Sequence, residues 1–141
     1  MPGLLRRPLL VIWFVILLTI NKKLDMAYDE FLAERILTVL DKKSIDYEQK
    51  KMFGGLCILV DDKMCVGVIK DDLMARVGEE AELAHQYDEG VRPMDFTTKR
   101  MKGYLYVNQL ALDKEDDLED WVQRCLDFNP KAKSSKKKKK N

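Results

Sequence analysis

Three basic side chains near residue 100 are the clearest candidates for binding an anion. Lys99, Arg100 and Lys102 lie in the polar segment 97–103, which we expect to be a loop between two strands. A nucleic-acid site usually needs a wider basic surface than three neighbouring residues provide. We therefore keep two interpretations, an anion-binding loop and an ordinary solvated hairpin loop, and favour the second.

The side chains that usually act in catalysis do not form a recognisable group in this sequence. His85 is the single histidine, and no serine or cysteine nucleophile stands in a recognisable relation to it. A general base and its nucleophile must come within hydrogen-bond reach. Paired carboxylates are typical of turns and helix starts, and three Asp-Asp pairs are interpreted in this way: Asp61-Asp62, Asp71-Asp72 and Asp116-Asp117. We expect a protein that is not an enzyme and that has no catalytic, cofactor-binding or metal-binding residues.

Three cysteines, Cys57, Cys65 and Cys125, are too few and too unevenly spaced for a disulfide framework or a zinc site. We expect them to act as small core residues. A two-residue turn at positions 61–62 would pair Ile58 with Cys65, so Cys57 and Cys65 would point to opposite faces of the sheet. A turn one residue longer or shorter would instead place both on the same face.

Composition predicts one globular domain with an acidic body. The chain has 141 residues, of which 46% are hydrophobic and 35% charged, enough apolar material to close a core. Between Met26 and Asn129 it carries 14 Lys and Arg against 23 Asp and Glu, a net charge of −9. Such a body does not attract a phosphate backbone. Any polyanion would therefore bind a local patch or the tail, residues 130–141, which holds seven lysines and which we expect to be disordered.

Residues 1–25 contain an apolar run from Pro8 to Ile20 between basic residues. This run is shorter than the roughly 20 residues of a spanning helix, and no small-residue cleavage site follows it. It could be an uncleaved anchor, a shortened membrane-associating helix, or an upstream extension of a protein that starts at Met26. We favour the extension, which predicts a cytoplasmic protein; a membrane anchor through residues 8–20 is the alternative.

The body begins with a helix predicted from Asp29 to Lys43. Acidic residues in its first turn and lysines in its last complement the helix dipole. Its apolar residues recur at helical spacing and should face the core: Phe31, Leu32, Ile36, Val39 and Leu40.

Strands are expected next, between Lys51 and Val77, with one reversal at Asp61-Asp62. Apolar residues occupy both faces of the first strand, whereas a sheet with one solvated face would alternate apolar with polar. Either helices cover both faces, or one face meets a partner. The glycines at 54, 55 and 67 predict a bulge or a close approach of two backbones.

The second half should begin with a short helix from Glu79 to Tyr87 that supplies apolar side chains to the core: Leu83, Ala84 and Tyr87. Strands are expected over residues 92–96 and 104–107. The last helix should run from Asp113, as its N-cap, to Phe128, with Pro130 preventing its continuation.

This order of elements resembles the TfoX N-terminal-domain family over about residues 26–128. The resemblance depends on Met52-Phe53-Gly54-Gly55 before the Asp-rich turn, and on Gly103-Tyr104 near the last strand. It implies an α+β fold: a helix, an antiparallel hairpin or meander, a second helix, two further strands, and a C-terminal helix packed on the sheet, in an architecture like that of secretion chaperones. The residues of this signature are interpreted as structural, and the family supplies no catalytic residue.

Named members of that family are bacterial regulators of competence genes that act with a DNA-bound activator. The resemblance therefore implies a non-enzymatic protein-interaction domain that regulates transcription without a DNA-reading domain of its own. From the residues, we expect it to bind a protein partner or a second copy through the apolar sheet or an edge strand. The alternative is a nucleic-acid-binding accessory protein that uses residues 99–102 and the lysine tail. A membrane would be a partner only if residues 1–25 belong to the protein.

Overall fold

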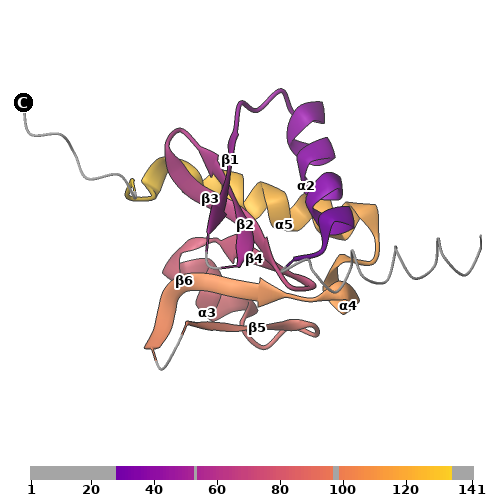
Figure 1. The fold of residues 1–141 in the computed structure, drawn as a ribbon. Helices are drawn as coiled ribbons and strands as arrows, with labels where there is room; N and C mark the ends of the chain where they lie inside the picture. The colour runs from indigo at the N-terminus through magenta and orange to yellow at the C-terminus, as the bar shows by residue number, and fades with distance from the viewer. Residues whose placement is uncertain (1–27, 53, 97–98, 135–141) are drawn as a thin grey trace, which may run out of the picture.

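A six-stranded antiparallel sheet forms the centre of the molecule (Figure 1), in a computed structural model that describes residues 28–52, 54–96 and 99–134. Its order is β1-β2-β3-β4-β6-β5. The strands are β1 (Glu48–Met52), β2 (Gly55–Val60), β3 (Lys63–Ile69), β4 (Asp72–Arg76), β5 (Val91–Phe96) and β6 (Lys99–Val107). The helices are α2 (Glu30–Lys42), α3 (Gly78–His85), α4 (Gln109–Leu112), α5 (Glu115–Phe128) and the 3-10 turn η1 (Asn129–Lys131). The predicted α+β class is confirmed.

Helix α2 forms as predicted and is capped by Asp29. The Asp29 carboxylate accepts the backbone N–H groups of Phe31 and Leu32 at 2.9 and 3.2 Å. Placing Phe31 on the buried stripe was wrong, because its side chain is 71% exposed. It precedes Ile36 by five residues, which turns it about 140° away from the core-facing side.

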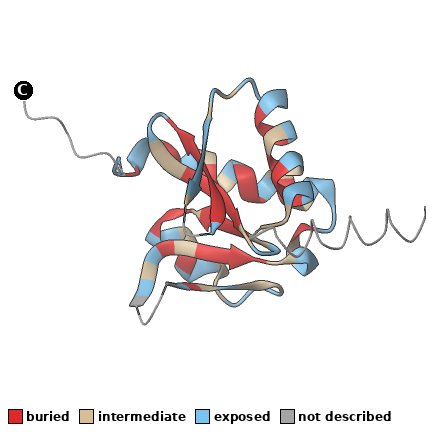
Figure 2. Cartoon of the chain, viewed as in Figure 1, coloured by how far each residue is buried: buried red, intermediate tan, exposed pale blue. Residues whose placement is uncertain are grey.

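The main core lies between one face of the sheet and the helices. Buried side chains from α2, α4 and α5 pack there against β2, β3, β4 and β6. Arg35 of α2 ties the helices together, since its guanidinium donates to the Leu112 carbonyl at 2.7 Å and to the Glu115 carboxylate at 3.0 Å. Figure 2 shows the buried residues concentrated in the central strands and on the inner sides of these helices.

The other face of the sheet has a smaller cluster, to which strands supply all members within the described residues. Five of these side chains are less than 10% exposed: Cys57, Leu59, Met74, Met94 and Tyr106. The sheet twists strongly, so that β5 and β6 cross the direction of β1 to β3 (Figure 1). The sheet's own methionine and tyrosine side chains therefore close this face, and no helix contributes to the cluster.

The single strand expected before the Asp61-Asp62 turn is in fact two. β1 pairs with β2 from Glu48↔Leu59 to Met52↔Gly55, and the chain reverses at Gly54, whose φ is +74°. The polar sequence of β1 concealed it: this edge strand has four exposed residues out of five.

The turn at Asp61 and Asp62 is confirmed, with φ of +53° and +63° as in the mirror-image turns that join twisted hairpins. The predicted pairing of Ile58 with Cys65 was wrong. A register shift follows Ile58, which pairs with Val66. Cys65 still lies in the main core and Cys57 in the second cluster, so the expected opposite orientation of the two thiols is confirmed.

Three predictions for the second half need correction. Residues 99–103 belong to strand β6 and not to a loop. Asp113 does not cap the last helix; it follows the short helix α4, whose own cap is the Asn108 side chain, and α5 begins at Glu115. Residues 130–134, assigned to the tail, lie against the β2–β3 turn, where the Ser134 hydroxyl donates to the Asp62 carbonyl at 3.2 Å.

The described helices are all too short or too polar to cross a membrane. Residues 1–27 and the lysine run 136–140 lie outside the described part of the chain.

Gly67 lies where two backbones come close, as its sequence context predicted. A Cβ there would stand 2.6 Å from the Leu56 carbonyl oxygen and 2.6 Å from the Met74 methyl carbon. The backbone oxygen has no freedom to move aside without breaking the β2–β3 ladder.

Replacing Gly67 by alanine tests this contact. We expect Gly67→Ala to lower the free energy of unfolding by about 1–3 kcal/mol, the usual cost of overpacking. Urea denaturation followed by circular dichroism measures the change. Gln49→Ala on the exposed strand β1 is the control, expected within about 0.5 kcal/mol of the parent. A Gly67→Ala protein as stable as this control would contradict the close approach.

Candidate functional site

A buried carboxylate fixes helix α3 to strand β6. The Glu82 side chain is 2% exposed. Its Oε1 accepts the backbone N–H of Gly103 at 2.7 Å, and its Oε2 accepts Nε and Nη2 of Arg100, the former at 2.9 Å. The Arg100 guanidinium also donates to the Gln86 side chain at 3.2 Å. A charge this deeply buried is stable only with such partners.

Gly103 allows the helix to come this close. Its φ is +86°, and a Cβ there would stand 3.3 Å from the Cα of Gly78, the first residue of α3. The Gly103 carbonyl accepts the Val77 N–H at 2.9 Å. The glycine of the family signature is thus a packing point between β6 and the start of α3.

The predicted anion site is not assembled as a group of free cations. Arg100 is engaged by Glu82, and only Lys102 has an exposed side chain that the structure describes without an ion pair. Lys99 is the first residue of β6, and its side chain lies outside the description. The positive charge of Arg100 is balanced within the fold and is less available to a phosphate.

The burial of Glu82 turns the apolar residues of α3 outward. Leu83 is 63% exposed and Tyr87, one turn later, is 89% exposed; Ala84 between them is exposed too. We placed these three residues in the core, and that prediction was wrong. At about 100° per residue, Leu83 lies to one side of the contact with β6 and Ala84 lies nearly opposite to it, once Glu82 is held against that strand. The outer face of α3, defined as Glu79, Glu80, Leu83 and Ala84 of the helix together with Tyr87 of the turn that follows it, is a solvent-facing surface with apolar side chains at its centre.

The inner side of α3 rests on α5. The His85 ring lies edge-on to Trp121 with centroids 5.6 Å apart, and His85 Nδ1 is 2.7 Å from a carboxylate oxygen of Asp88. His85 therefore packs on Trp121 and has one polar partner, Asp88, just after the end of the helix.

The cysteines are all free and buried. Burial raises the pKa of the Cys65 thiol to about 12 and raises the pKa of Cys125 well above its ordinary value. Both thiols stay protonated at neutral pH, and a protonated thiol is a poor nucleophile.

The edges of the sheet are poor templates for adding a strand. β1 presents exposed charged and polar side chains, and β5 contains Pro93, which has no N–H to donate. Charges and proline on edge strands are the usual protection against edge-to-edge pairing. An edge strand is therefore a weaker candidate contact surface than the outer face of α3.

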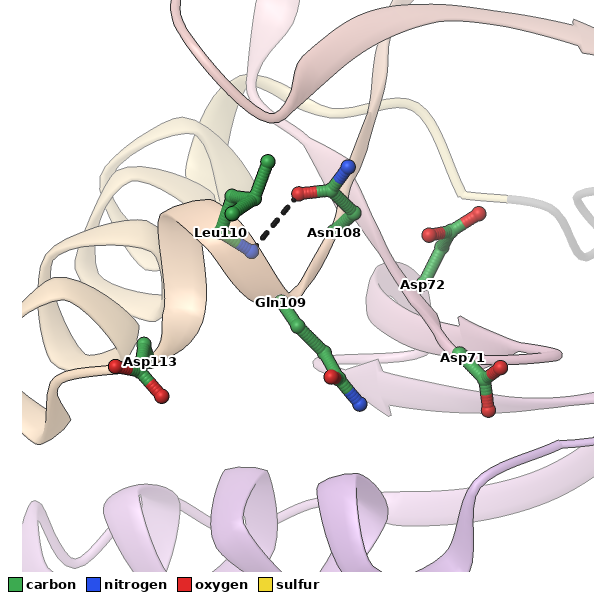
Figure 3. A pocket seen from close by; sticks show the side chains of 6 residues that line it. All are labelled: Asp71, Asp72, Asn108, Gln109, Leu110 and Asp113. Atoms are coloured by element: carbon green, nitrogen blue, oxygen red, sulfur yellow. Dashed lines mark hydrogen bonds between the residues drawn. The ribbon is translucent and has the colours of Figure 1, made fainter.

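Two of the hollows lined by described residues lie on the acidic surface. The larger, of about 570 Å³, is lined by side chains from the β3–β4 turn and from α4 (Figure 3), with Asp72 held at 2.7 Å by Arg92. The smaller, of about 200 Å³, separates the loop after α3 from α5 and is lined by Asp88, Glu89, Asp117, Asp120, Trp121 and Arg124, among others. No group of three metal-ligating side chains occurs in the described residues.

The other signature residues that the structure describes lie at packing positions. Met52 ends β1 and contacts the second cluster, and Gly55 opens β2, where a Cβ would meet the Val68 carbonyl. The Arg76 guanidinium lies 5.5 Å from the centre of the Tyr104 ring. Phe53 lies outside the described residues.

Sequence reasoning missed the outer face of α3 because no local signal marks it. The helix carries acidic residues at 79, 80 and 82, close to Leu83. The sequence of the helix alone therefore does not show whether Leu83 or one of these carboxylates faces the core. The residue that decides the orientation, Arg100, comes 18 residues later.

The fold and the site define a small α+β domain whose helices cover one face of an antiparallel sheet and whose short crossover helix displays apolar side chains to solvent. The chain belongs to the TfoX N-terminal domain family, whose model matches residues 42–129. Neither the curated proteins nor the solved structures include a significant match.

Removing the Glu82 carboxylate tests its role in docking α3. We expect Glu82→Ala to lower the free energy of unfolding by about 3 kcal/mol, at the lower end for broken buried ion pairs because the Arg100 side chain is 47% exposed. Glu82→Gln should cost less, since the amide oxygen can still accept the Gly103 N–H. Denaturant titration measures both, with exposed Glu80→Ala as the control. Equal stability of the Glu82→Ala and Glu80→Ala proteins would refute the anchoring role.

Proposed function

We propose that this chain is a non-enzymatic protein-interaction domain and that the outer face of α3 contacts its partner. One observation carries the proposal: α3 buries a carboxylate and exposes Leu83, the reverse of an ordinary surface helix, and Tyr87 in the turn after it is exposed as well. Exposed apolar side chains gathered on one element are typical of protein-binding sites, and tyrosine is enriched in such interfaces.

The sheet itself is a weaker choice for the contact surface. The centre of its second face is already closed by its own side chains, and both edges carry the features that prevent pairing. Family membership supports a role in regulating transcription, exerted through a protein that binds DNA, because the named members of the family are competence regulators.

Crosslinking from the outer face tests the contact. With a photoreactive residue in place of the exposed Ala84, we expect one defined crosslinked protein, identified by mass spectrometry, in cells that express the full chain. Leu83→Ser with Tyr87→Ser should abolish this product while changing the free energy of unfolding by less than about 0.5 kcal/mol, since both side chains are exposed. The same probe at exposed Glu34 of α2 is the control. A product unaffected by the double variant would exclude this surface.

A second candidate, nucleic-acid binding, now depends chiefly on the tail. Lys131 and Lys133 are exposed at the point where the chain leaves the body, and five further lysines follow. Arg100 contributes less than its sequence position indicated, because Glu82 already pairs with it.

Deleting residues 135–141 measures the contribution of the tail. If it binds single-stranded nucleic acid, the affinity of the full chain should fall with salt, with a logarithmic slope of about −0.7 for each phosphate neutralised. The deletion should reduce that slope by the equivalent of up to five contacts and leave the packed residues 129–134 in place. An unchanged slope, or no binding at low salt, would contradict this candidate.

A further inference from the structure

Carboxylates surround the exposed apolar side chains of α3. Glu79 and Glu80 precede Leu83, and Asp88 and Glu89 follow Tyr87 directly, all four with exposed side chains. Asp88 is paired with His85, whereas Glu79, Glu80 and Glu89 form no ion pair within the described residues. The apolar centre of the outer face thus lies inside a negatively charged border.

The smaller hollow extends this border toward α5. Asp88 and Glu89 stand on its one side and Asp117 and Asp120 on the other, around a volume of about 200 Å³. Arg124 is the one cation among its described lining residues, and its guanidinium stacks on the Trp121 ring at 4.6 Å. The hollow has the size and charge to receive the end of a lysine or arginine side chain beside the apolar centre.

A second copy of this chain is a poor occupant for such a surface. A symmetric dimer places the same patch on both subunits. The glutamates of one α3 would then meet the acidic border of the other, and like charges brought together across an interface are unfavourable. The lysine tail of the chain itself is also a poor occupant, because after Pro130 it has no apolar residue larger than alanine to cover Leu83 and Tyr87.

These charges lead to an inference that rests on the proposed function. We propose that the outer face of α3 binds a basic amphipathic segment of a partner protein: apolar side chains cover Leu83 and Tyr87, and flanking Lys or Arg side chains meet Glu79, Glu80 and the hollow beside Asp88. An amphipathic helix laid along α3 has this arrangement, with apolar anchors one turn apart.

Two synthetic probes test the charge requirement. Both are amphipathic peptides of about four helical turns with the same leucine stripe, and they differ only in carrying lysine or glutamate at the flanking positions. Each is titrated into the isotope-labelled full chain, and the amide chemical shifts and the dissociation constant are measured. We expect the lysine peptide to shift the amides of residues 79–89 and the glutamate peptide to leave them unchanged.

Charge reversal on the protein provides the matched control. Glu80→Lys with Glu89→Lys should weaken the lysine peptide by about tenfold, because two attractive contacts become repulsive. Glu30→Lys with Glu34→Lys, on the exposed side of α2, changes the net charge equally and should leave the affinity unaltered. Equal weakening by the two variants would show unspecific attraction to the acidic body and overturn the inference.

The remaining outcomes separate this inference from the proposed function. If both peptides bind residues 79–89 equally, the basic character is wrong while α3 remains a contact surface. If neither peptide shifts these amides, the inference is overturned, and the crosslinking from position 84 alone decides whether α3 contacts a different kind of partner.

Discussion

The arrangement of the second half of the fold depends on one ionised side chain held away from water. Glu82 satisfies both carboxylate oxygens by bonding to Arg100 and to the Gly103 backbone. A buried charge without such partners would cost more than the packing of a short helix can supply. The contact of Glu82 with Arg100 and Gly103 therefore determines the orientation of α3. In this orientation the Leu83 and Ala84 side chains are exposed to solvent.

Features encoded within a few residues could be predicted from the sequence. The acidic first turn and the periodic apolar residues predicted α2, the Asp61-Asp62 turn was predicted from its composition, and Gly67 was expected to mark a bulge or a close backbone approach. Each depends on local geometry that the residue types themselves impose. Family membership was recognisable for the same reason, since its signature residues occupy turns and packing points.

Features that depend on distant partners could not be predicted in this way. The sequence of β1 resembles that of a polar connecting segment, because an edge strand can expose nearly all its side chains. Because of the register shift after Ile58, this residue pairs with Val66, whereas a regular ladder from the Asp61-Asp62 turn would pair it with Cys65. The outer face of α3 was assigned to the core because periodicity assumes that leucine points inward and glutamate outward, and the partner that reverses this at Glu82 lies on another element.

The contact between the β2–β3 turn and the end of α5 bears on how the nascent chain folds. The Asn129 amide donates to the Val60 carbonyl at 3.1 Å, and the Lys63 ammonium donates to the Asn129 carbonyl at 3.2 Å. The two pairs of partners are 69 and 66 residues apart in the sequence. The hairpin can therefore pair early on the ribosome, but its turn acquires these hydrogen bonds only after Asn129 has emerged, long after the two strands that the turn joins have been synthesised.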